Sequence, residues 1–318
     1  MDKKNIVVIG GGTGQSVILR GLKNLDDVHL TTIVTVADDG GSTGRLRKSF
    51  QIPAMGDIRN VMIALSESEP LLTMMMNYRF EGDAGNEIAG HNLGNLILTA
   101  LMQTSGSFMQ AISDISKVLK IKGDIIPATT QMVTLCARMS NGTIVRGESS
   151  IPKYDDRVVE VFYREPVKAT VTALDAILNA DIIIFGIGSL YTSILPNIII
   201  EDIRQALLET KATKIYLCNA MTQHGETDDY QLEDHVQAIE DHLKGKIDLV
   251  IKANDQLPAS ILQRYVLEKA YPVTISKQQH DYLIESYQLL NFENDLIRHD
   301  SNCIREIFAD VIKRYGRK

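Results

Sequence analysis

The sequence has few cysteines and no long hydrophobic run, and both shortages narrow the class of protein. The three cysteines, Cys136, Cys218 and Cys303, are far apart and match neither a disulfide framework nor a metal-binding spacing. An odd number of cysteines without a secretory signal is typical of a reducing compartment. No apolar run approaches the roughly 18 residues that cross a bilayer. We therefore expect a cytoplasmic protein with no membrane span.

The sequence also has fewer basic than acidic residues. The chain of 318 residues carries 33 Lys and Arg against 40 Asp and Glu, a net charge of −7. Because binding to a nucleic-acid backbone depends on clustered Lys and Arg, we expect no nucleic-acid partner. Internal repeats, low-complexity tracts and Pro/Ser-rich linkers are absent from the sequence as well. We expect a single domain over residues 1–318 rather than two independent ones.

The start of the chain predicts a strand, a glycine turn and a helix. Residues 6–9 read Ile-Val-Val-Ile, residues 10–14 read Gly-Gly-Gly-Thr-Gly, and a helical pattern follows over residues 16–22. Glycines allow a tight turn whose backbone N–H groups approach a phosphate at a helix N-terminus. The spacing misses the dinucleotide fingerprint, since Gln15 stands at its third glycine, and no Walker sequence occurs. A tight turn without a ligand remains the alternative.

Strands and helices alternate at both ends of the chain, which predicts a doubly wound, mostly parallel, Rossmann-like α/β sheet. Strands are expected at residues 30–36, 181–186, 214–219 and 246–251, and helices at residues 57–66, 70–78, 93–102, 108–119, 200–209, 232–243 and 259–269. The middle is helix-rich, and residues 131–165 are β-rich, with a hairpin at Asn141-Gly142. We expect a helical and β-hairpin insertion at about 66–165, in which Met74, Met75 and Met76 fill core space.

Six polar segments fall where strands end or helices begin. They are residues 10–14, 38–45, 56–60, 90–95, 186–193 and 219–227. Each alone is explained by turn chemistry. Together, at the carboxyl edge of one parallel sheet, they predict a binding cleft.

The residue types suggest roles in that cleft. Gly188, Ser189 and Thr192 can offer donors to a second anionic group, and two anion sites favour a diphosphate-bridged ligand. Carboxylates suit Mg²⁺, and the candidates are Asp38, Asp39 and Asp57, although Asp57 is equally explained as a helix N-cap. Phosphate could also be paired by arginine, and the candidates are Arg45, Arg47 and Arg59, of which Arg59 is equally explained by an aspartate partner.

His91 is the histidine most suited to chemistry, because Gly90, Asn92 and Asn95 flank it. It can act as a donor or as a general acid or base near neutral pH. His224, beside Gln223, is the second candidate. The sequence offers no nucleophile with an identifiable base, so the candidates for a catalytic role are limited to His91, Asp38 and Asp57.

Taken together, the motifs resemble the gluconeogenesis factor family, the bacterial YvcK-like branch related to archaeal 2-phospho-L-lactate transferase (CofD-like). They are Gly-Gly-Gly-Thr-Gly at 10–14, Ala-Asp-Asp-Gly-Gly-Ser at 37–42, Gly-Asp-Ile-Arg-Asn at 56–60, Gly-His-Asn-Leu-Gly-Asn at 90–95, Gly-Ser-Leu-Tyr-Thr-Ser at 188–193 and Met-Thr-Gln at 221–223. The resemblance spans residues from about 5 to 310. Ile187 and His224 stand where the family pattern suggests proline, which affects loop stiffness more than charge.

The resemblance implies a homodimeric cytoplasmic factor for cell shape and cell-wall synthesis during growth on gluconeogenic carbon sources. It also implies a UDP-sugar ligand such as UDP-N-acetylglucosamine, and we expect cell-wall synthesis proteins as partners. The related transferase branch uses Mg²⁺, which we expect here as a second ligand. The residues expected to line the cleft are Gly11, Gly12, Thr13, Gly14, Asp38, Gly40, Gly41, Ser42, Asp57, Asn60, His91, Asn95, Gly188, Ser189, Thr192, Asn219, Thr222 and Gln223, with Asp38 and Asp57 as the metal ligands.

Three functions therefore stay open. A regulatory UDP-sugar binder without turnover is favoured. A Mg²⁺-dependent transferase of the 2-phospho-L-lactate transferase type is the alternative, and an NAD-dependent enzyme with Asp38 on a ribose hydroxyl is the third.

Overall fold

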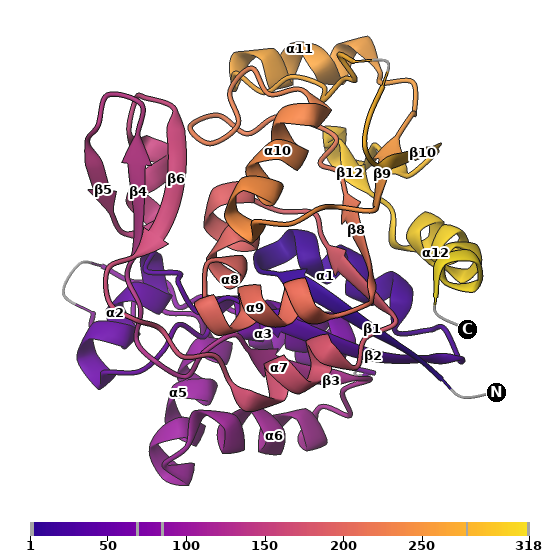
Figure 1. Cartoon of the computed structure of the whole chain (residues 1–318). Coiled ribbons are helices and arrows are strands. Elements are labelled where there is room, and N and C mark those ends of the chain that lie inside the picture. Colours follow the sequence, from indigo (N-terminus) through magenta and orange to yellow (C-terminus); the bar gives the residue numbers. More distant parts are fainter. Residues whose placement is uncertain (1–2, 68–69, 84–85, 278, 317–318) are drawn as a thin grey trace.

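A parallel sheet of seven strands runs through the centre of the molecule (Figure 1). The structure is a computed structural model, and it describes residues 3–67, 70–83, 86–277 and 279–316. The strand order is β10-β9-β8-β7-β1-β2-β3, and every neighbouring pair is parallel. The strands are β1 (Lys4–Gly10), β2 (Val28–Val34), β3 (Asp124–Pro127), β7 (Ile182–Phe185), β8 (Thr213–Leu217), β9 (Leu249–Ala253) and β10 (Leu283–Tyr287).

The chain winds outward from β1 in both directions, first through β2 and β3 and later through β7 to β10. Right-handed crossovers in opposite directions place their helices on opposite faces of a sheet. One group of contacting helices is α1 (Gly12–Leu22), α3 (Gly56–Leu65) and α12 (Ser301–Tyr315). The other is α7 (Val171–Leu178), α8 (Leu195–Ile198), α9 (Glu201–Glu209) and α10 (Leu232–Leu243). The doubly wound α/β fold expected from the sequence is confirmed.

The central strands β1 and β7 are buried on both faces, because helices cover each side of the sheet. Ile6, Ile9 and Phe185 have no exposed surface, which explains the continuous apolar runs in the sequence. The register pairs Ile9 with Phe185, so both strands end at the same level of the sheet. The loops after β1 and β7 therefore leave the sheet side by side, at the point where the winding direction reverses. Ligands of doubly wound proteins bind at this point.

An antiparallel lobe of three strands lies beside the sheet (Figure 1). Its order is β5-β4-β6, and it consists of β4 (Leu135–Met139), β5 (Ile144–Arg146), the 3-10 helix η1 (Glu148–Lys153) and β6 (Val158–Tyr163). The hairpin expected at Asn141-Gly142 joins β4 to β5, where Gly142 has a φ of 84° and donates its N–H to the Met139 carbonyl. The lobe is one part of the span expected as an insertion.

Besides α1 and α3, the chain before the lobe forms α2 (Gly41–Phe50), α4 (Pro70–Asn77), α5 (Leu93–Ser105) and α6 (Phe108–Val118). Strand β3 follows α6 and joins the edge of the main sheet beside β2. The span from 66 to 165 therefore contains one strand of the central sheet, with helices before it and the antiparallel lobe after it. The remaining elements are α11 (Ala259–Leu267), the π-helical turn η2 (Leu190–Ile194), η3 (Glu293–Asp295), β11 (Leu290–Asn291) and β12 (Arg298–His299).

The expectation that the methionine triplet fills the core is wrong for two of its three residues. Met76 is buried, but Met74 is 63% exposed and Met75 is 43% exposed. The eight-residue helix α4 packs on α3 and α5, so only one side of it is covered. Within the described residues, no helix has the length and apolar character needed to cross a membrane.

Candidate functional site

The glycine segment after β1 forms a turn that is packed against the loop after β7. Gly12 has a φ of +66°, a conformation that favours glycine. A Cβ atom on Gly14 would lie only 2.2 Å from the carbonyl oxygen of Ile187. Gly14 is therefore required for the close approach of the two loops, and helix α1 begins directly at this contact.

Gln15 explains why the dinucleotide fingerprint lacks its third glycine. Its side chain is fully buried between α1 and the sheet. The Nε2 atom lies 3.1 Å from the Val8 carbonyl, 2.7 Å from Oγ1 of Thr32 and 3.1 Å from the Ile33 carbonyl. In the fingerprint the third glycine lets the helix lie close to the sheet, whereas here an amide occupies that space.

Asp57 faces the glycine turn from the first turn of α3. The N-cap of α3 is Met55, so the alternative that Asp57 caps this helix is wrong. A Cβ atom on Gly11 would lie 2.6 Å from Oδ2 of Asp57, and the Gly12 N–H donates to the same carboxylate. Burial and the charge of Asp38 raise the pKa of Asp57 to about 7, against the opposing effects of Gly12 and Arg59. The glycine turn, which the sequence predicts as a phosphate-binding site, thus already has the carboxylate of Asp57 beside it.

Asp38 and Asp39 follow β2 at the same edge, but their carboxylates have different surroundings. Oδ1 of Asp38 accepts the Gly40 N–H at 2.8 Å, and its Oδ2 would lie 2.8 Å from a Cβ atom on Gly56. Oδ1 of Asp39 accepts the Ser149 N–H from the antiparallel lobe at 2.9 Å. Asp38 therefore lies near Asp57 at the edge where the sequence predicts a cleft, whereas Asp39 fastens the lobe.

Glu148 was missed by sequence reasoning. It begins η1 in the lobe, and burial together with the charges of Asp38 and Asp57 raises its pKa to about 8, with smaller effects of Glu226 and Asp39. The lobe thus brings a third carboxyl group into the electrostatic field of the cleft. No motif could have found it, because Glu148 is separated from Asp38 and Asp57 by many residues and lies in an otherwise ordinary turn sequence.

His91 belongs to a hydrogen-bonded network at the start of α2 and α5. Its Nδ1 lies 3.1 Å from Oγ of Ser42, and the ring is only 8% exposed. Asn95 Nδ2 lies 3.4 Å from Oγ of Ser42 and 3.4 Å from Oγ1 of Thr43. Burial, Arg45 and Arg79 lower the pKa of His91. A neutral imidazole in a polar network results.

The three arginines considered for phosphate have different partners. Arg59 donates from Nη1 to Oδ1 of Asn95 at 3.0 Å and from Nη2 to Oδ1 of Asn60 at 2.8 Å, so amides rather than an aspartate hold it in place. Arg47 is buried and donates to backbone carbonyls, including that of Asp38 at 2.8 Å. Arg45 is exposed and donates to the Ala89 carbonyl at 2.7 Å.

In the loop after β7, the side chains expected to meet an anion already have partners within the protein. Asn219 accepts the Gly188 N–H at 3.2 Å and donates to the Gly188 carbonyl at 2.8 Å. Ser189 donates to Gln223 at 2.8 Å. Thr192 donates to Glu226 at 2.7 Å. A ligand that used the hydroxyls of Ser189 and Thr192 would have to replace these bonds.

Glu226 is the second residue that sequence reasoning missed. It is buried, and besides Thr192 it accepts the Tyr191 N–H at 2.9 Å. Burial raises its pKa, against several hydrogen bonds that lower it. Glu226 therefore holds the loop after β7 in place through its hydrogen bonds to Tyr191 and Thr192. In the sequence, only its position within the polar segment 219–227 could have suggested this role.

The remaining candidates lie around this edge or away from it. Thr13 is exposed in the first turn of α1, and Gly40 and Gly41 begin α2. Thr222 bonds through both its backbone and its hydroxyl to Tyr271, which ties it to a different part of the chain. His224 is exposed and pairs with Asp228 at 2.7 Å.

The carboxylates fit a divalent cation by their chemistry. Mg²⁺ binds to oxygen ligands, usually one or two carboxylates together with ligand phosphates, and Asp38 and Asp57 are such a pair. Within the described part of the chain, no group of three or more His, Cys, Asp or Glu side chains is arranged as a complete metal site. A phosphate ligand would therefore have to complete the coordination.

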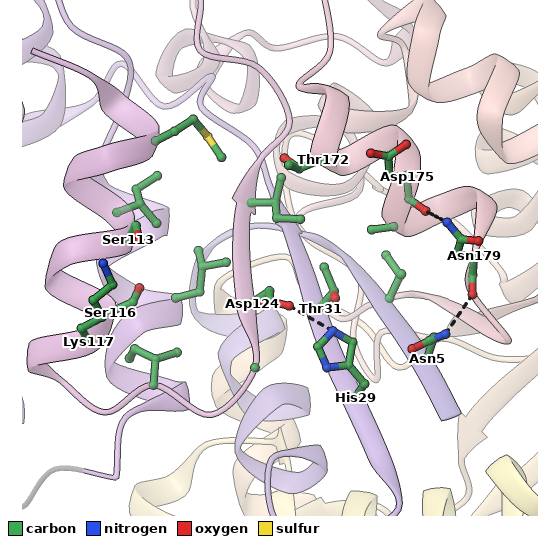
Figure 2. Close-up of a pocket in the computed structure, with 18 of the residues that line it drawn as sticks. Asn5, His29, Thr31, Ser113, Ser116, Lys117, Asp124, Thr172, Asp175 and Asn179 are labelled. Carbon is green, nitrogen blue, oxygen red and sulfur yellow. Dashed lines mark hydrogen bonds and ion pairs between the residues drawn. The ribbon is translucent and has the colours of Figure 1, made fainter. Parts of the chain in front are cut away.

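A cavity of about 780 Å³ lies at the opposite end of the sheet (Figure 2). It is a groove between α6 and α7 over the amino-terminal halves of β1, β2 and β3. Two of its polar side chains, His29 and Asp124, pair at 3.0 Å, and Asn5 donates to the Asn179 carbonyl at 3.2 Å. Because ligands of doubly wound sheets bind at the carboxyl ends of strands, we do not assign the functional site to this groove.

Comparison with known proteins gives one consistent family. The model of the family described as 2-phospho-L-lactate transferase CofD matches residues 6–289. The protein named "Gluconeogenesis factor" of Halalkalibacterium halodurans is 46% identical over 316 residues, which cover 98% of this chain and 97% of the relative. The "Gluconeogenesis factor" of Bacillus subtilis is 43% identical over 317 residues, 98% of this chain and 99% of the relative.

A solved structure supports the same relationship. The crystal structure of a member of the UPF0052 family from Bacillus halodurans superposes with a TM-score of 0.92 and is 44% identical. It covers 96% of this chain and 99% of the other chain, so the likeness includes the sheet, the glycine turn and the lobe.

Proposed function

Because the chain belongs to the family of 2-phospho-L-lactate transferase CofD, we propose that its glycine-turn edge binds a nucleotide sugar of the UDP-N-acetylglucosamine type together with Mg²⁺. The relatives named gluconeogenesis factor support the role of a gluconeogenesis factor for this protein. We propose a regulatory factor that acts in the cytoplasm on cell shape and cell-wall synthesis during growth on gluconeogenic carbon sources. The three cysteines are free thiols, as expected for a reducing compartment.

The position of Asp57 against the glycine turn is the observation that carries this proposal. A diphosphate at the turn would meet the backbone donors of residues 11–14 and the carboxylate of Asp57 at the same time. Two anions repel each other in a partly buried cleft unless a cation lies between them. Mg²⁺ held by Asp57 and Asp38 would remove that repulsion and contact the diphosphate. This arrangement favours a diphosphate ligand over a simple monoanion.

The non-nucleotide part of the ligand would lie toward the lobe. Glu148 of the lobe lies in the electrostatic field of Asp38 and Asp57, and carboxyl groups accept hydrogen bonds from sugar hydroxyls. A hydroxyl-rich group attached to the diphosphate therefore fits the polar lining better than an apolar one.

Binding is tested by calorimetry and thermal shift with UDP-N-acetylglucosamine, NAD and GTP, each with Mg²⁺ and with EDTA. We expect the UDP-sugar with Mg²⁺ to bind and to stabilise the fold by about 2.7 kcal/mol at a hundred times its dissociation constant. NAD is expected to give no shift, since the segment after β1 departs from the dinucleotide fingerprint, with a buried Gln15 at the position of the third glycine. Stabilisation by NAD and none by the UDP-sugar would overturn the proposal.

A transferase is the second candidate, and the pKa of Asp57 is what favours it. A carboxyl group with a pKa of about 7 is suited to general acid–base catalysis at neutral pH. We nevertheless expect the UDP-sugar to stay intact, because the sequence motifs offer no nucleophile with an identifiable base. Chromatography for free UDP or UMP, with and without acceptors, distinguishes the two. Turnover that is lost in both Asp57→Asn and His91→Ala would establish the transferase.

We also propose that the protein is a homodimer and that cell-wall synthesis proteins receive its signal. Sedimentation at several protein concentrations tests the first point. A single species with the mass of one 35.3 kDa chain would contradict it.

A further inference from the structure

His242 joins three parts of the structure that are far apart in the sequence. It lies in the last turn of α10 and is buried. Its Nε2 lies 3.1 Å from the backbone N of Val161, in the middle of β6. Its ring also packs at 77° against Tyr191 of η2, with ring centroids 6.0 Å apart. Figure 1 shows β6 as the strand of the lobe nearest α10.

The two hydrogen bonds of the ring fix its protonation state. Nδ1 lies 2.7 Å from the Ala238 carbonyl, which can only accept, so Nδ1 carries the hydrogen. Val161 N–H can only donate, so Nε2 must be the unprotonated acceptor. The imidazole is therefore neutral, and a second proton on Nε2 would break the bond to the lobe.

Cross-strand pairs connect the bonded residue Val161 through the lobe to the segment that carries Glu148. Val161 pairs with Ala137 of β4, and Ala137 pairs with Val145 of β5. These three side chains are buried together, with at most 9% exposed. Glu148 follows Val145 by three residues. Val161 on β6 is thus connected through β4 to Val145 on β5, and the chain runs from there directly to Glu148.

We propose that His242 is a positioning residue that fastens the antiparallel lobe to the α/β core and so holds Glu148 at the cleft. Protonation of His242 releases the edge of β6 and loosens this placement. The effect on ligand affinity rests on the proposed function, whereas the fastening itself does not.

Several elements bring charged groups near His242, and the groove that His242 lines is also lined by Glu201, Asp202 and Arg204 of α9. Asp241 and Lys244 lie on α10 and Glu160 on β6, while η2 contributes the uncharged ring of Tyr191. Burial lowers the pKa of His242, and Lys244 adds to the lowering. The bond to the Ala238 carbonyl and the charges of Asp241 and Glu160 raise the pKa but do not outweigh burial. The neutral, bonded form is therefore the form present at neutral pH.

The test compares three variants in the intact protein without ligand. In His242→Leu the ring acceptor is gone, and the Val161 amide should exchange with solvent about tenfold faster, as expected for loss of one hydrogen bond. In His242→Gln, Oε1 can accept the same bond and cannot titrate, so protection should stay close to wild type at every pH. His235→Gln is the matched control. His235 is two turns earlier on the same helix, is also buried and bonds to the Gln231 carbonyl, whereas the bond to β6 is made by His242.

Two further readouts separate positioning from ordinary stability. Carboxyl NMR titration of Glu148 should show its pKa moving from about 8 toward the usual range in His242→Leu, but not in His242→Gln or His235→Gln. In the wild type, the protection factor of Val161 should fall as the pH drops below the usual histidine range, and this fall should be absent in His242→Gln.

Equal protection of Val161 in the wild type and His242→Leu, or an unchanged Glu148 titration, would overturn the proposal. If His242→Leu fails to fold, the comparison of the wild type with His242→Gln across pH decides it, and parallel pH profiles would refute it. All these measurements stand if UDP-N-acetylglucosamine does not bind, so failure of the proposed function is distinguishable from failure of this one.

Discussion

A Cβ atom on Gly11 would lie 2.6 Å from Oδ2 of Asp57 and 2.7 Å from Cγ2 of Thr35. The backbone of Gly11 is extended, with a φ of −172°, so the requirement for glycine here is one of space and not of conformation. The first loop of the sheet and the carboxylate of α3 therefore fit together only because residue 11 has no side chain.

Gly11→Ala should displace Asp57 and weaken ligand binding. We expect a loss of stability of about 1–3 kcal/mol, as for an added methyl group in a packed site. Gly10→Ala is the matched control, because a Cβ there would meet only the side chain of Gln15 at 3.6 Å or more. Denaturant unfolding and calorimetry of both variants provide the measurement. Equal effects of the two substitutions would contradict the close packing of Gly11 on Asp57.

Asp57→Asn tests the role of Mg²⁺. If Asp57 holds the cation between itself and a diphosphate, UDP-sugar affinity should fall about tenfold or more with Mg²⁺ and change little with EDTA. Asp228→Asn is the control, since Asp228 is exposed and pairs with His224 outside the cleft. An equal loss for Asp57→Asn in both buffers would show that its carboxylate acts without a metal.

Glu148→Gln should stabilise the protein in alkaline solution. The folded-state pKa of about 8 lies above the ordinary value of 4.5, so the folded protein keeps a proton that the unfolded chain loses. The stability linked to this group is present below pH 4.5 and is lost as the pH rises toward 8. Glutamine cannot ionise and avoids this loss. We expect Glu148→Gln to gain roughly 1–3 kcal/mol over the wild type at pH 8.5.

Thermal unfolding at pH 5 and pH 8.5 measures this difference. The gain should be small at pH 5, where most of the linked stability is still present. Glu160→Gln, on the exposed face of the lobe, provides the comparison. A gain that does not depend on pH would mean that Glu148 does not titrate in the field of the other carboxylates.

His299 should make the fold sensitive to acid. Its side chain is buried, and burial lowers its pKa to about 4 despite the opposing effects of Asp255 and a backbone bond. Below the ordinary value of 6.5, the unfolded chain binds a proton that the folded protein does not. Stability should therefore fall between pH 6.5 and pH 4, by up to about 3 kcal/mol from this group.

His299→Gln removes that titration, and its unfolding free energy should fall less steeply over the same range. Denaturant unfolding at intervals between pH 7 and pH 4 measures both slopes. His29, which is half-exposed, provides the control substitution His29→Gln. Identical slopes for the wild type and His299→Gln would show that His299 does not remain neutral in the folded protein.

Much of the fold could be predicted because its signals are local. The apolar runs at residues 6–9 and 182–185 are strands buried on both faces, and such strands need continuous apolar sequence. The Asn141-Gly142 turn fixes a hairpin by the φ that glycine allows. The exposed Met74 and Met75 could not be foreseen, because whether α4 is covered on one side or two depends on what packs against it.

The candidate site was predicted in part for the same reason. The sequence singled out Asp57 by residue type as a candidate Mg²⁺ ligand, yet could not choose between that role and a helix N-cap. That choice depends on where α3 begins relative to β1, and the structure places Met55 at the cap and Asp57 against Gly12. From the sequence alone, the hydroxyls of Ser189 and Thr192 could be taken for free donors. Their partners Gln223 and Glu226 are known only from the structure.

By itself, the sequence determined the parallel sheet, the glycine turn and the grouping of polar loops at one edge, because periodicity and residue chemistry act over a few neighbouring positions. Only the tertiary structure decided that Glu148 joins Asp38 and Asp57, that Gln15 fills the third glycine's place, and that His242 holds the lobe. Gln15 contacts residues 7 to 18 positions away, whereas His242 and Val161 are 81 positions apart, and Glu148 lies still farther along the chain from Asp38 and Asp57. The energies of these interactions depend on distance and burial, and neither quantity exists until the chain has folded.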